Sequence, residues 1–526
     1  MSQKENFIQT INDGYNFKGK SIILGGAMLD GKCQTNTLVK IPLRTMNRHG
    51  LIAGATGSGK TKTLQILAEQ LSAQGVPVLL MDIKGDLSGI AAKSPGHPKI
   101  DERHEKIGIP FEAGTSPIEF LTLSDEPGAR LRATVTEFGP VLFSKILQLS
   151  DTQSGIVSVV FKYCDDNNIA LVDLKDFKKT LEYMTGEGKE EIKSLYGSMS
   201  TASTGTIIRK IIEIEQQGAD RFFGEVSFEI EDLIRTDEDG KGMVSVVRLT
   251  DLQDRPKLFS TFMLQMMAEI YATLPEQGDS EKPELVIFID EAHLMFNEAS
   301  DALLDQIEAI VKLIRSKGVG LFFVTQNPSD VPDAVLGQLG LKIQHALRAF
   351  TAKDRKAIKL AAQNYPLTDY YDTAELLTNL GIGEAIVTVL SEKGIPTPLA
   401  HTLLRAPQSR MDVLEAAEIK HIISQSEIIK KYNIEVDRES AYEILGEKIT
   451  LAKEAEHQEE IKKQQEKAAK VTTSRRSSKA DKSVVEKAMD NTAVRQVGRT
   501  VARELTRGLL GALGIKTTRR RRRKLW

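Results

Sequence analysis

Residues 50–65 read GLIAGATGSGKTKTLQ, and this stretch decides the fold. Residues 54–61 match the pattern G-x-x-x-x-G-K-[ST], in which glycines let successive backbone N–H groups turn toward phosphate oxygens. The apolar run LIAG precedes the pattern, and Leu64, Leu67 and Leu71 after it are spaced for one face of a helix. A strand, a glycine loop and a helix in this order predict a P-loop, which binds the phosphates of a nucleotide.

The predicted phosphate site runs through the loop into the first turn of the helix. It comprises Gly54, Ala55, Thr56, Gly57, Ser58, Gly59, Lys60, Thr61 and Lys62. We expect Lys60 to reach the β- and γ-phosphates of ATP and to assist catalysis, and Thr61 to ligate Mg²⁺. The alternative is a plain glycine turn.

Further strand patterns follow along the chain. VPVLLMD at 76–82 is uniformly apolar, as expected for a strand covered on both faces of a parallel sheet. The other runs alternate with helical segments and are MVSVVRL (243–249), ELVIFID (284–290), VGLFFVT (319–325) and GEAIVTVL (383–390). This alternation predicts an α/β fold with a doubly wound, mainly parallel sheet.

We expect four regions along the chain. Residues 1–45 form a short N-terminal β segment, and residues 46–405 form the main α/β domain. This domain carries a helical insertion at about 125–240, where the sequence is polar and has no long apolar run. Residues 406–470 are a charged helical region, and residues 471–526 are a basic linker, an amphipathic helix and an Arg-rich tail.

The composition of the 526 residues, 41% hydrophobic and 27% charged, is that of a soluble globular protein. The chain has no run of about 18 apolar residues, and its start, MSQKENFIQT, lacks the order of a signal peptide. These features predict a cytoplasmic protein. Cys33 and Cys164 lie far apart without nearby ligands, so we expect neither a disulfide nor a zinc site.

The net charge of minus 2 is unevenly distributed. Residues 471–526 hold 16 Lys and Arg against 4 Asp and Glu, a net of plus 12, which leaves minus 14 on residues 1–470. A basic tail on an acidic body predicts a polyanionic partner or contact with the body itself. Three partners stay open for the tail: an acidic protein surface including its own body, nucleic acid, and a membrane surface.

The strand at 284–290 ends in two carboxylates, Asp290 and Glu291. A P-loop needs a carboxylate on a neighbouring strand to hold Mg²⁺, and a second one can polarise the attacking water. We assign the metal role to Asp290 and the catalytic role to Glu291; the alternative is an N-cap pair of the next helix. His293 is expected to be structural or peripheral.

Two more polar residues lie around the strand at 319–325. Gln326 follows the strand at the edge where open α/β sheets bind ligands, so its amide is expected to sense the γ-phosphate and to orient water. The alternative for Gln326 is an ordinary polar loop residue. Arg315 precedes the strand, and its position alone favours a cation that stabilises a helix C-terminus.

Five segments together resemble one family: NRHGLIAGATGSGKT, LMDIKGDLSGI, VIFIDEAH, IRSKGVGLFFVTQNPSD and LGLKIQHALRAF. Over most of residues 10–405 the chain resembles the HerA/FtsK superfamily of motor ATPases, and closely its bacterial HerA-like branch of YjgR type. The resemblance implies a RecA-like P-loop NTPase fold and a homo-hexameric ring that hydrolyses ATP at subunit interfaces. HerA itself pumps double-stranded DNA beside a partner nuclease.

The resemblance also implies roles for single residues. Arg315 falls where the family places an arginine finger that reaches the neighbour's nucleotide, and Arg48 matches a cis-acting arginine near the nucleotide. Asp82, Lys84 and Asp86 match a family loop, for which we predict no role; a solvated loop is the alternative. The N-terminal β segment is shorter than the barrel with which HerA docks its nuclease, which argues against a nuclease partner here.

Two functions follow from these observations. The first is a Mg²⁺-dependent ATPase acting as a DNA translocase or helicase in a hexameric ring. The alternative is an ATPase switch or scaffold with a protein or membrane partner and no movement on DNA. No loop that contacts DNA can be picked out from the sequence.

Overall fold

The computed structural model describes residues 2–253, 255–278, 280–296, 301–434, 436 and 438–474. The chain divides into two compact units, Met1–Ile449 and Thr450–Trp526. The predicted linker, amphipathic helix and Arg-rich tail lie outside the described residues, apart from the end of one long helix at Ser474. No helix among the described residues is long and apolar enough to cross a membrane.

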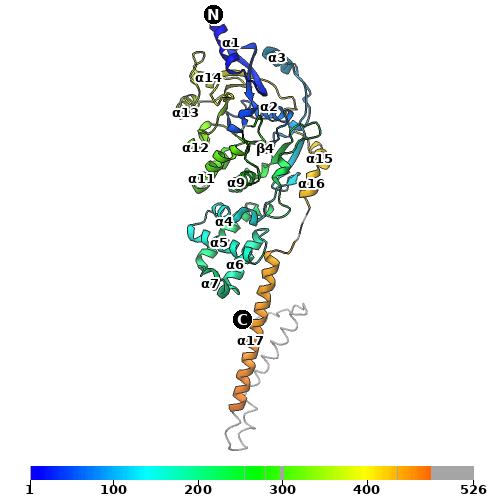
Figure 1. The fold of residues 1–526 in the computed structure, drawn as a ribbon, viewed down its shortest axis with the longest axis vertical. Coiled ribbons are helices and arrows are strands. Elements are labelled where there is room, and N and C mark those ends of the chain that lie inside the picture. Colours follow the sequence, from blue (N-terminus) through cyan, green and yellow to red (C-terminus); the bar gives the residue numbers. More distant parts are fainter. Residues whose placement is uncertain are drawn as a thin grey trace, which may run out of the picture. The chain divides into compact units, whose positions relative to one another are not determined.

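The described residues form a sheet of twelve strands, in the order β2-β1-β12-β11-β10-β3-β9-β8-β4-β7-β5-β6 (Figure 1). The strands are β1 Ser21–Leu29, β2 Lys32–Pro42, β3 Gly50–Ala53, β4 Val78–Asp82, β5 Ile118–Thr122, β6 Ala129–Arg130, β7 Val244–Arg248, β8 Leu285–Ile289, β9 Val319–Thr325, β10 Leu341–Gln344, β11 Glu384–Thr388 and β12 Ala400–Leu404. From β10 to β6 every neighbouring pair is parallel. The predicted α/β fold with a mainly parallel sheet is confirmed.

The other side of the sheet is antiparallel and was not predicted. β11, β12, β1 and β2 add to β10 one after another, each antiparallel to the last. The N-terminal strands β1 and β2 are therefore continuous with the main sheet. Gly25 permits this pairing, because a Cβ there would lie 2.0 Å from the carbonyl oxygen of Leu403.

The central strands are buried along their whole length, and successive side chains enter two different cores. Leu79, Met81 and Ile287 face one core, which α9 and α11 cover. Leu80 and Phe288 face the other, which α2 and α1 cover. This burial on both faces explains why these strands are apolar without alternation.

The larger helices are α1 Gln3–Gly14, α2 Lys60–Ala73, α3 Pro98–Ile107, α9 Pro256–Thr273, α11 Asp301–Ile314, α13 Ala352–Ala362, α15 Ala416–Gln425 and α17 Ala441–Ser474. Shorter ones are α10 His293–Phe296, α12 Asp333–Leu336, α14 Thr373–Asn379 and α16 Glu427–Tyr432. The predicted capping box at the start of α13 is present, because Thr351 and Asp354 cap each other's backbone N–H groups.

A group of helices lies between β6 and β7 in the chain (cyan in Figure 1). It comprises α4 Val135–Ile146, α5 Asp151–Asp166, α6 Leu174–Thr185, α7 Lys189–Tyr196 and α8 Thr201–Gln216. Phe143, Phe177 and other residues of these helices share one core with α9 and with the first turns of α17. The buried Asp176 fixes the start of α17, because it accepts hydrogen bonds from Ser440 Oγ at 2.6 Å and from Tyr442 N at 2.8 Å.

Candidate nucleotide site

The P-loop, residues 54–59, connects β3 to α2. Its start is held between two strand ends, because Gly54 N donates to Thr325 O at 3.2 Å and Ala55 N donates to Ala346 O at 2.8 Å. Gly54 has φ of 152°, and a Cβ there would lie 2.5 Å from Cβ of His345. The glycine is therefore required by the close approach of the chain as well as by a ligand.

The residues predicted to bind phosphate line this loop and the start of α2. Lys60 is only 7% exposed, and its Nζ donates to Gly54 O at 2.7 Å and to Ala55 O at 3.3 Å. Burial lowers the pKa of Lys60, and the nearby cation of Lys84 lowers it further. Thr56 and Gly57 are exposed at the tip of the loop, where a phosphate can approach their N–H groups.

The remaining residues of the predicted set support the loop. Ser58 Oγ donates to Ala55 O at 2.6 Å, which closes the turn from inside. Lys62 donates to the carbonyl oxygen of Met411 and, at 3.3 Å, to Gln65 Oε1. In the structure the Lys62 side chain contacts α2 and a distant loop.

Asp290 and Glu291 directly follow β8 and are 4% and 5% exposed. Burial raises the pKa of Asp290 to about 7, although the nearby ammonium of Lys84 lowers it. Glu291 has a left-handed backbone, with φ of 47°, which is costly for a residue with a side chain. Both carboxylates interact electrostatically with Lys60, so the P-loop and β8 contribute to one site.

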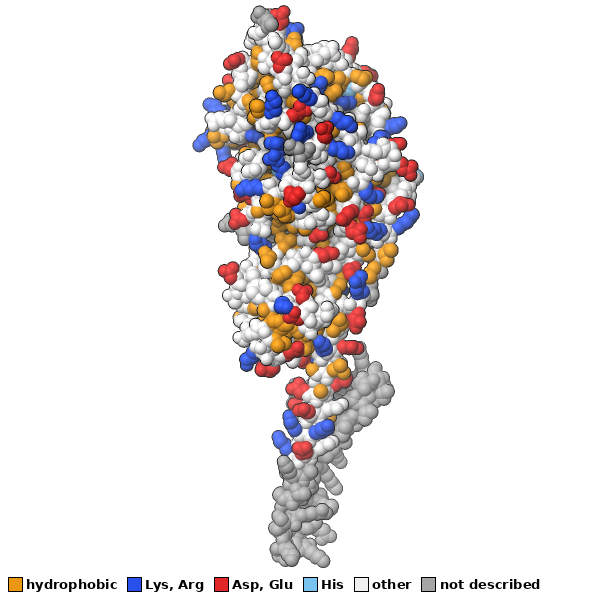
Figure 2. Space-filling model, viewed as in Figure 1, with side chains coloured by type: hydrophobic (Ala, Val, Ile, Leu, Met, Phe, Trp, Pro, Cys, Tyr) orange, Lys and Arg blue, Asp and Glu red, His pale blue; other side chains and the backbone are white. Residues whose placement is uncertain are grey.

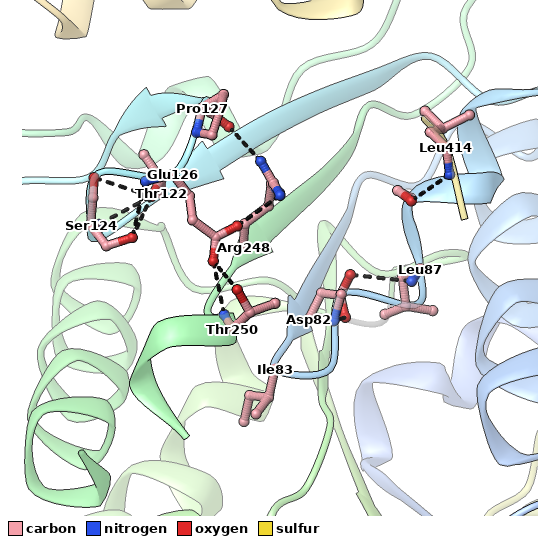
Figure 3. A network of polar contacts seen from close by, with 12 residues as sticks. Asp82, Ile83, Leu87, Thr122, Ser124, Glu126, Pro127, Arg248, Thr250 and Leu414 are labelled. Carbon is pink, nitrogen blue, oxygen red and sulfur yellow. Dashed lines mark hydrogen bonds and ion pairs between the residues drawn. The ribbon is translucent and has the colours of Figure 1, made fainter. Parts of the chain in front are cut away.

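The loop after β4 also belongs to this site. Asp82 is 2% exposed, and its Oδ1 accepts Gly85 N at 2.7 Å while its Oδ2 accepts Leu87 N at 3.2 Å (Figure 3). Burial raises the pKa of Asp82 to about 6, and these backbone hydrogen bonds lower it. The sequence left open a solvated loop as the alternative for this segment, but Asp82 is buried.

The two other charged residues of this loop, Lys84 and Asp86, contact Glu291 and Thr61. Lys84 forms an ion pair with Glu291. Thr61 Oγ1 donates to Asp86 Oδ2 at 3.2 Å. Asp86 Oδ1 is buried and has no hydrogen-bond partner within the described ranges. The sequence signal was present, since three charged residues follow a buried strand, but it did not show which partners they meet.

A polar network behind this loop was missed by the sequence analysis (Figure 3). Glu126 accepts from Arg248 at 2.8 Å, from Thr250 N at 3.1 Å and from the Thr250 hydroxyl. Gln253 Nε2 donates to Ile83 O at 2.7 Å. These contacts join the ends of β5, β7 and β4, and their partners are too far apart in the chain to be paired by local pattern.

Two residues near Glu291 also lie at the carboxyl edge of the sheet, where the parallel strands end. Gln326 directly follows β9 and is exposed, whereas the preceding Thr325 is fully buried. His293 Nδ1 lies 3.2 Å from Glu291 Oε2. His293, expected to be structural or peripheral, is thus in direct contact with the predicted catalytic carboxylate.

A buried histidine behind the P-loop was also missed. His345 follows β10, and its Nε2 lies 2.9 Å from Thr63 Oγ1 on α2. Burial lowers the pKa of His345 to about 4, and Lys60 lowers it further. A neutral ring is therefore expected at neutral pH, which avoids a second buried cation beside Lys60.

Arg315 and Arg48 lie together at the opposite edge of the sheet, the amino edge, where the parallel strands begin. Arg315 begins the short helix Arg315–Lys317 before β9, and Arg48 ends the short helix Leu43–Arg48 before β3. Both line one open, polar cavity of about 630 Å³, together with Arg44, Lys312 and Glu392. Since β3 and β9 are parallel, the length of a strand separates this cavity from the P-loop, and six residues of strand span about 20 Å.

This placement bears on both arginine predictions. Arg48 cannot cover about 20 Å to the P-loop of its own chain, so the structure does not support a cis contact with the nucleotide. Arg315 is exposed at the end of α11, as either a helix-end cation or a finger toward another subunit requires. The sequence showed no sign that the two arginines share a cavity.

The parallel sheet, the glycine loop and the carboxylates at one edge define a P-loop NTPase. The chain belongs to the helicase HerA-like C-terminal family, whose model matches residues 28–521. It is similar to the DNA double-strand break repair helicase HerA of Saccharolobus solfataricus, with 24% identity over 358 residues, 67% of this chain and 64% of the relative. The HerA of Sulfolobus acidocaldarius is 23% identical over 363 residues, again 67% of this chain and 64% of that protein. The chain thus spans about 64% of the length of these relatives.

A solved structure supports the fold. The plasmid coupling protein TrwB, in complex with the non-hydrolysable ATP analogue ADPNP, has a TM-score of 0.51 to this chain and 14% sequence identity. The similarity covers 79% of this chain and 96% of TrwB. At this identity the likeness establishes the RecA-like P-loop NTPase fold alone.

Proposed function

We propose that this protein is a Mg²⁺-dependent ATPase that moves duplex DNA as a translocase or helicase, in a ring of six identical subunits. One observation carries the proposal: the residues predicted to bind phosphate and to activate water lie at the carboxyl edge, whereas the arginines lie about 20 Å away at the amino edge. A ring that joins the amino edge of one subunit to the carboxyl edge of the next completes the site. Two similar relatives are named DNA double-strand break repair helicases.

In this proposal each residue at the carboxyl edge has one task. Lys60 binds the β- and γ-phosphates, Glu291 accepts a proton from the attacking water, and Gln326 orients that water. Arg315 and Arg48 approach the γ-phosphate from the neighbouring subunit, where Arg315 stabilises the charge that develops during transfer.

The donor set fits magnesium. Thr61 offers a hydroxyl, Asp290 a buried carboxylate, and Asp86 a buried oxygen without a hydrogen-bond partner in the described part of the chain. Oxygen ligands of this kind are those that Mg²⁺ takes, often through water. When bound, Mg²⁺ neutralises phosphate charge, and Thr61 and Asp290 are the residues that would hold it.

In this proposal Glu291 has two states, one paired with Lys84 and one released from it. Its ammonium pairs with Glu291, and a carboxylate held by a cation is a weaker base. Hydrolysis therefore requires Lys84 to leave Glu291, and the phosphates of a bound ATP would offer Lys84 another anion beside Asp290 and Asp86. Glu291 would therefore be a stronger base when ATP is bound than when the site is empty.

The test is ATP hydrolysis by the purified protein with and without linear double-stranded DNA. The full-length chain is compared with one that ends at Lys470, because the basic tail is an independent candidate for DNA contact. Stimulation by DNA in both proteins supports the motor. Hydrolysis that is indifferent to DNA supports the switch or scaffold, which the net charge of minus 14 on residues 1–470 favours. Absence of hydrolysis under all conditions would overturn the assignment of the site.

A further inference from the structure

The most basic short segment of the described chain is α13 with the residues just before it. Positions 348–359 hold five cations, Arg348, Lys353, Arg355, Lys356 and Lys359, against the single carboxylate of Asp354. Asp354 is occupied at the start of the helix, where its Oδ2 accepts Phe350 N at 2.9 Å and Thr351 N at 2.8 Å. This net of plus 4 contrasts with the net of minus 14 over residues 1–470.

The cations of α13 face solvent. The helix packs through Ile358 and Ala361, which are 5% and 7% exposed. Arg355, Lys356 and Lys359 are exposed, and within the described ranges their side chains make no ion pair or hydrogen bond. Figure 2 shows Lys and Arg side chains on the part of the surface where Figure 1 labels α13.

An exposed aromatic ring stands beside this basic face. Phe350, at the start of α13, is 88% exposed, and Leu360 within the helix is 54% exposed. Cations that lack partners repel one another, and a phenylalanine in water gains nothing from burial. Both features are expected of a surface that is covered when a partner binds.

The same segment is bonded directly to the P-loop. His345 N donates to Ala53 O at 2.7 Å, Ala55 N donates to Ala346 O at 2.8 Å, and the ring of His345 meets Thr63 at 2.9 Å. Four residues separate Ala346 from Thr351, the N-cap of α13. The P-loop and α13 are therefore joined by a short stretch of chain whose start is hydrogen-bonded to the P-loop.

We propose that α13 contacts the phosphate backbone of duplex DNA and that the P-loop controls this contact. The proposal rests on the proposed function and adds the surface that the sequence did not reveal. Lys353 to Lys359 span about 9 Å along the helix, a length over which duplex DNA carries several phosphates. A membrane surface fits less well, because Ile358 and Ala361 are buried against the protein and leave Leu360 as the one large apolar side chain exposed on α13.

The test neutralises the three unpaired cations in the full-length protein, as Arg355→Gln, Lys356→Gln and Lys359→Gln together. The matched control is Lys4→Gln, Lys18→Gln and Lys20→Gln, which removes three exposed cations and changes net charge equally. Binding to a linear duplex is measured by fluorescence anisotropy over a range of salt. Each lost phosphate contact reduces the slope of log K against log salt by about 0.9, so the α13 variant should lose about 2 to 3 and the control nothing.

ATP hydrolysis separates the contact from the catalytic site. The α13 variant should keep the basal rate without DNA and lose most of its stimulation by DNA, whereas the control should keep both. Equal melting temperatures of the two variants and the unchanged protein would show that the fold is intact. A fall of the basal rate equal to the loss of stimulation would overturn the proposal, because α13 would then serve the site itself.

The outcomes also separate this proposal from the one on which it rests. If the unchanged protein neither binds duplex DNA nor responds to it, the proposed function fails and this inference with it. If it does both and the α13 variant keeps its salt slope and stimulation, only this inference fails. Loss of binding to phosphatidylserine vesicles in a variant that still binds DNA would assign α13 to a membrane and overturn the contact with DNA.

Discussion

At the carboxyl edge of the parallel strands the charged residues are buried and bonded to one another, whereas at the amino edge they line an open cavity. Lys60, Asp290 and Glu291 are each less than a tenth exposed, and Lys84 links two strands by its ion pair with Glu291. Arg315, at the other edge, is exposed and lies in the short helix Arg315–Lys317 before β9.

In the proposed ring, the difference shows which half of the site is organised within one chain. Buried polar groups must find partners, so the carboxyl edge is fixed by the fold of a single subunit. The amino edge is under less constraint, since its arginines line an open cavity that water can enter. We therefore expect changes at the carboxyl edge to act within a subunit and changes at the amino edge to act on the neighbour.

The largest effect is expected from Arg315→Ala, which should lower kcat for ATP hydrolysis by about 10³ to 10⁵ because it removes charge stabilisation in the transition state. Lys312→Ala is the matched control, since it removes a cation from the same helix end and tests the helix-dipole role. Mixing Arg315→Ala with Glu291→Gln subunits should restore part of the activity, because each variant supplies the half that the other lacks. An unchanged rate for Arg315→Ala would mean that Arg315 only stabilises the C-terminal end of the helix.

Glu291→Gln should lower kcat by about 10² to 10⁴, the usual contribution of a general base, with nucleotide affinity nearly unchanged. The amide keeps the shape of the side chain and cannot accept the proton. Single-turnover hydrolysis and binding of a fluorescent nucleotide measure the two quantities. Glu308→Gln, on α11, is a control that should leave both intact; a fall in affinity alone for Glu291→Gln would contradict the role of a base.

Arg48→Ala should have a smaller effect, about 10- to 100-fold on kcat, which is the worth of one charged hydrogen bond. The mixing experiment decides which subunit it serves. If Arg48 acts on the neighbour, Glu291→Gln subunits should partly rescue Arg48→Ala. If Glu291→Gln subunits rescue Arg315→Ala but not Arg48→Ala in the same assay, the two arginines do not act together on the neighbouring subunit.

The smallest effect is the change in the free energy of unfolding expected from Asp290→Asn in the absence of nucleotide and metal. Burial raises the pKa of Asp290 to about 7, against about 3.9 for an unfolded Asp. The folded protein thus binds this proton more tightly, so the stabilisation is fully present below about pH 4 and is lost as pH rises through about 7. Asp290→Asn should raise the free energy of unfolding at pH 8 by about 1 to 4 kcal/mol and change nothing at pH 4.

The measurement for Asp290→Asn is denaturant unfolding without nucleotide or divalent cations. Asp333→Asn, at an exposed position, is the control that should show no such difference between pH 4 and pH 8. Equal stability of Asp290→Asn and the unchanged protein at pH 8 would mean that the carboxylate is not penalised by burial. The carboxyl edge would then be less closed than the structure shows.

Local patterns sufficed for much of the fold and for half of the site. Residues 54–61 identify the P-loop because the glycines, lysine and threonine act within one turn of chain. Asp290, Glu291 and Gln326 could be placed at one edge because each follows an apolar run, and parallel strands end together. None of these inferences needs to know which strands are neighbours.

The remaining features depend on strand order and on contacts between distant residues. Strand β1 pairs with β12 almost four hundred residues later, so no local pattern reveals the antiparallel extension. The burial of Asp82 and the contact of His293 with Glu291 could not be predicted for the same reason, since both are set by the tertiary structure.

The sequence by itself determined that this protein is a P-loop NTPase with a parallel sheet, because periodicity and motif spacing are properties of short stretches. Only the tertiary structure decided that Lys84 holds Glu291, that Arg48 shares a cavity with Arg315 away from its own P-loop, and that α13 presents unpaired cations. The physical reason is that burial and ion pairing are set by which surfaces meet when the strands assemble. The sequence gives the chemical type of each side chain, whereas the tertiary structure determines which residues it contacts.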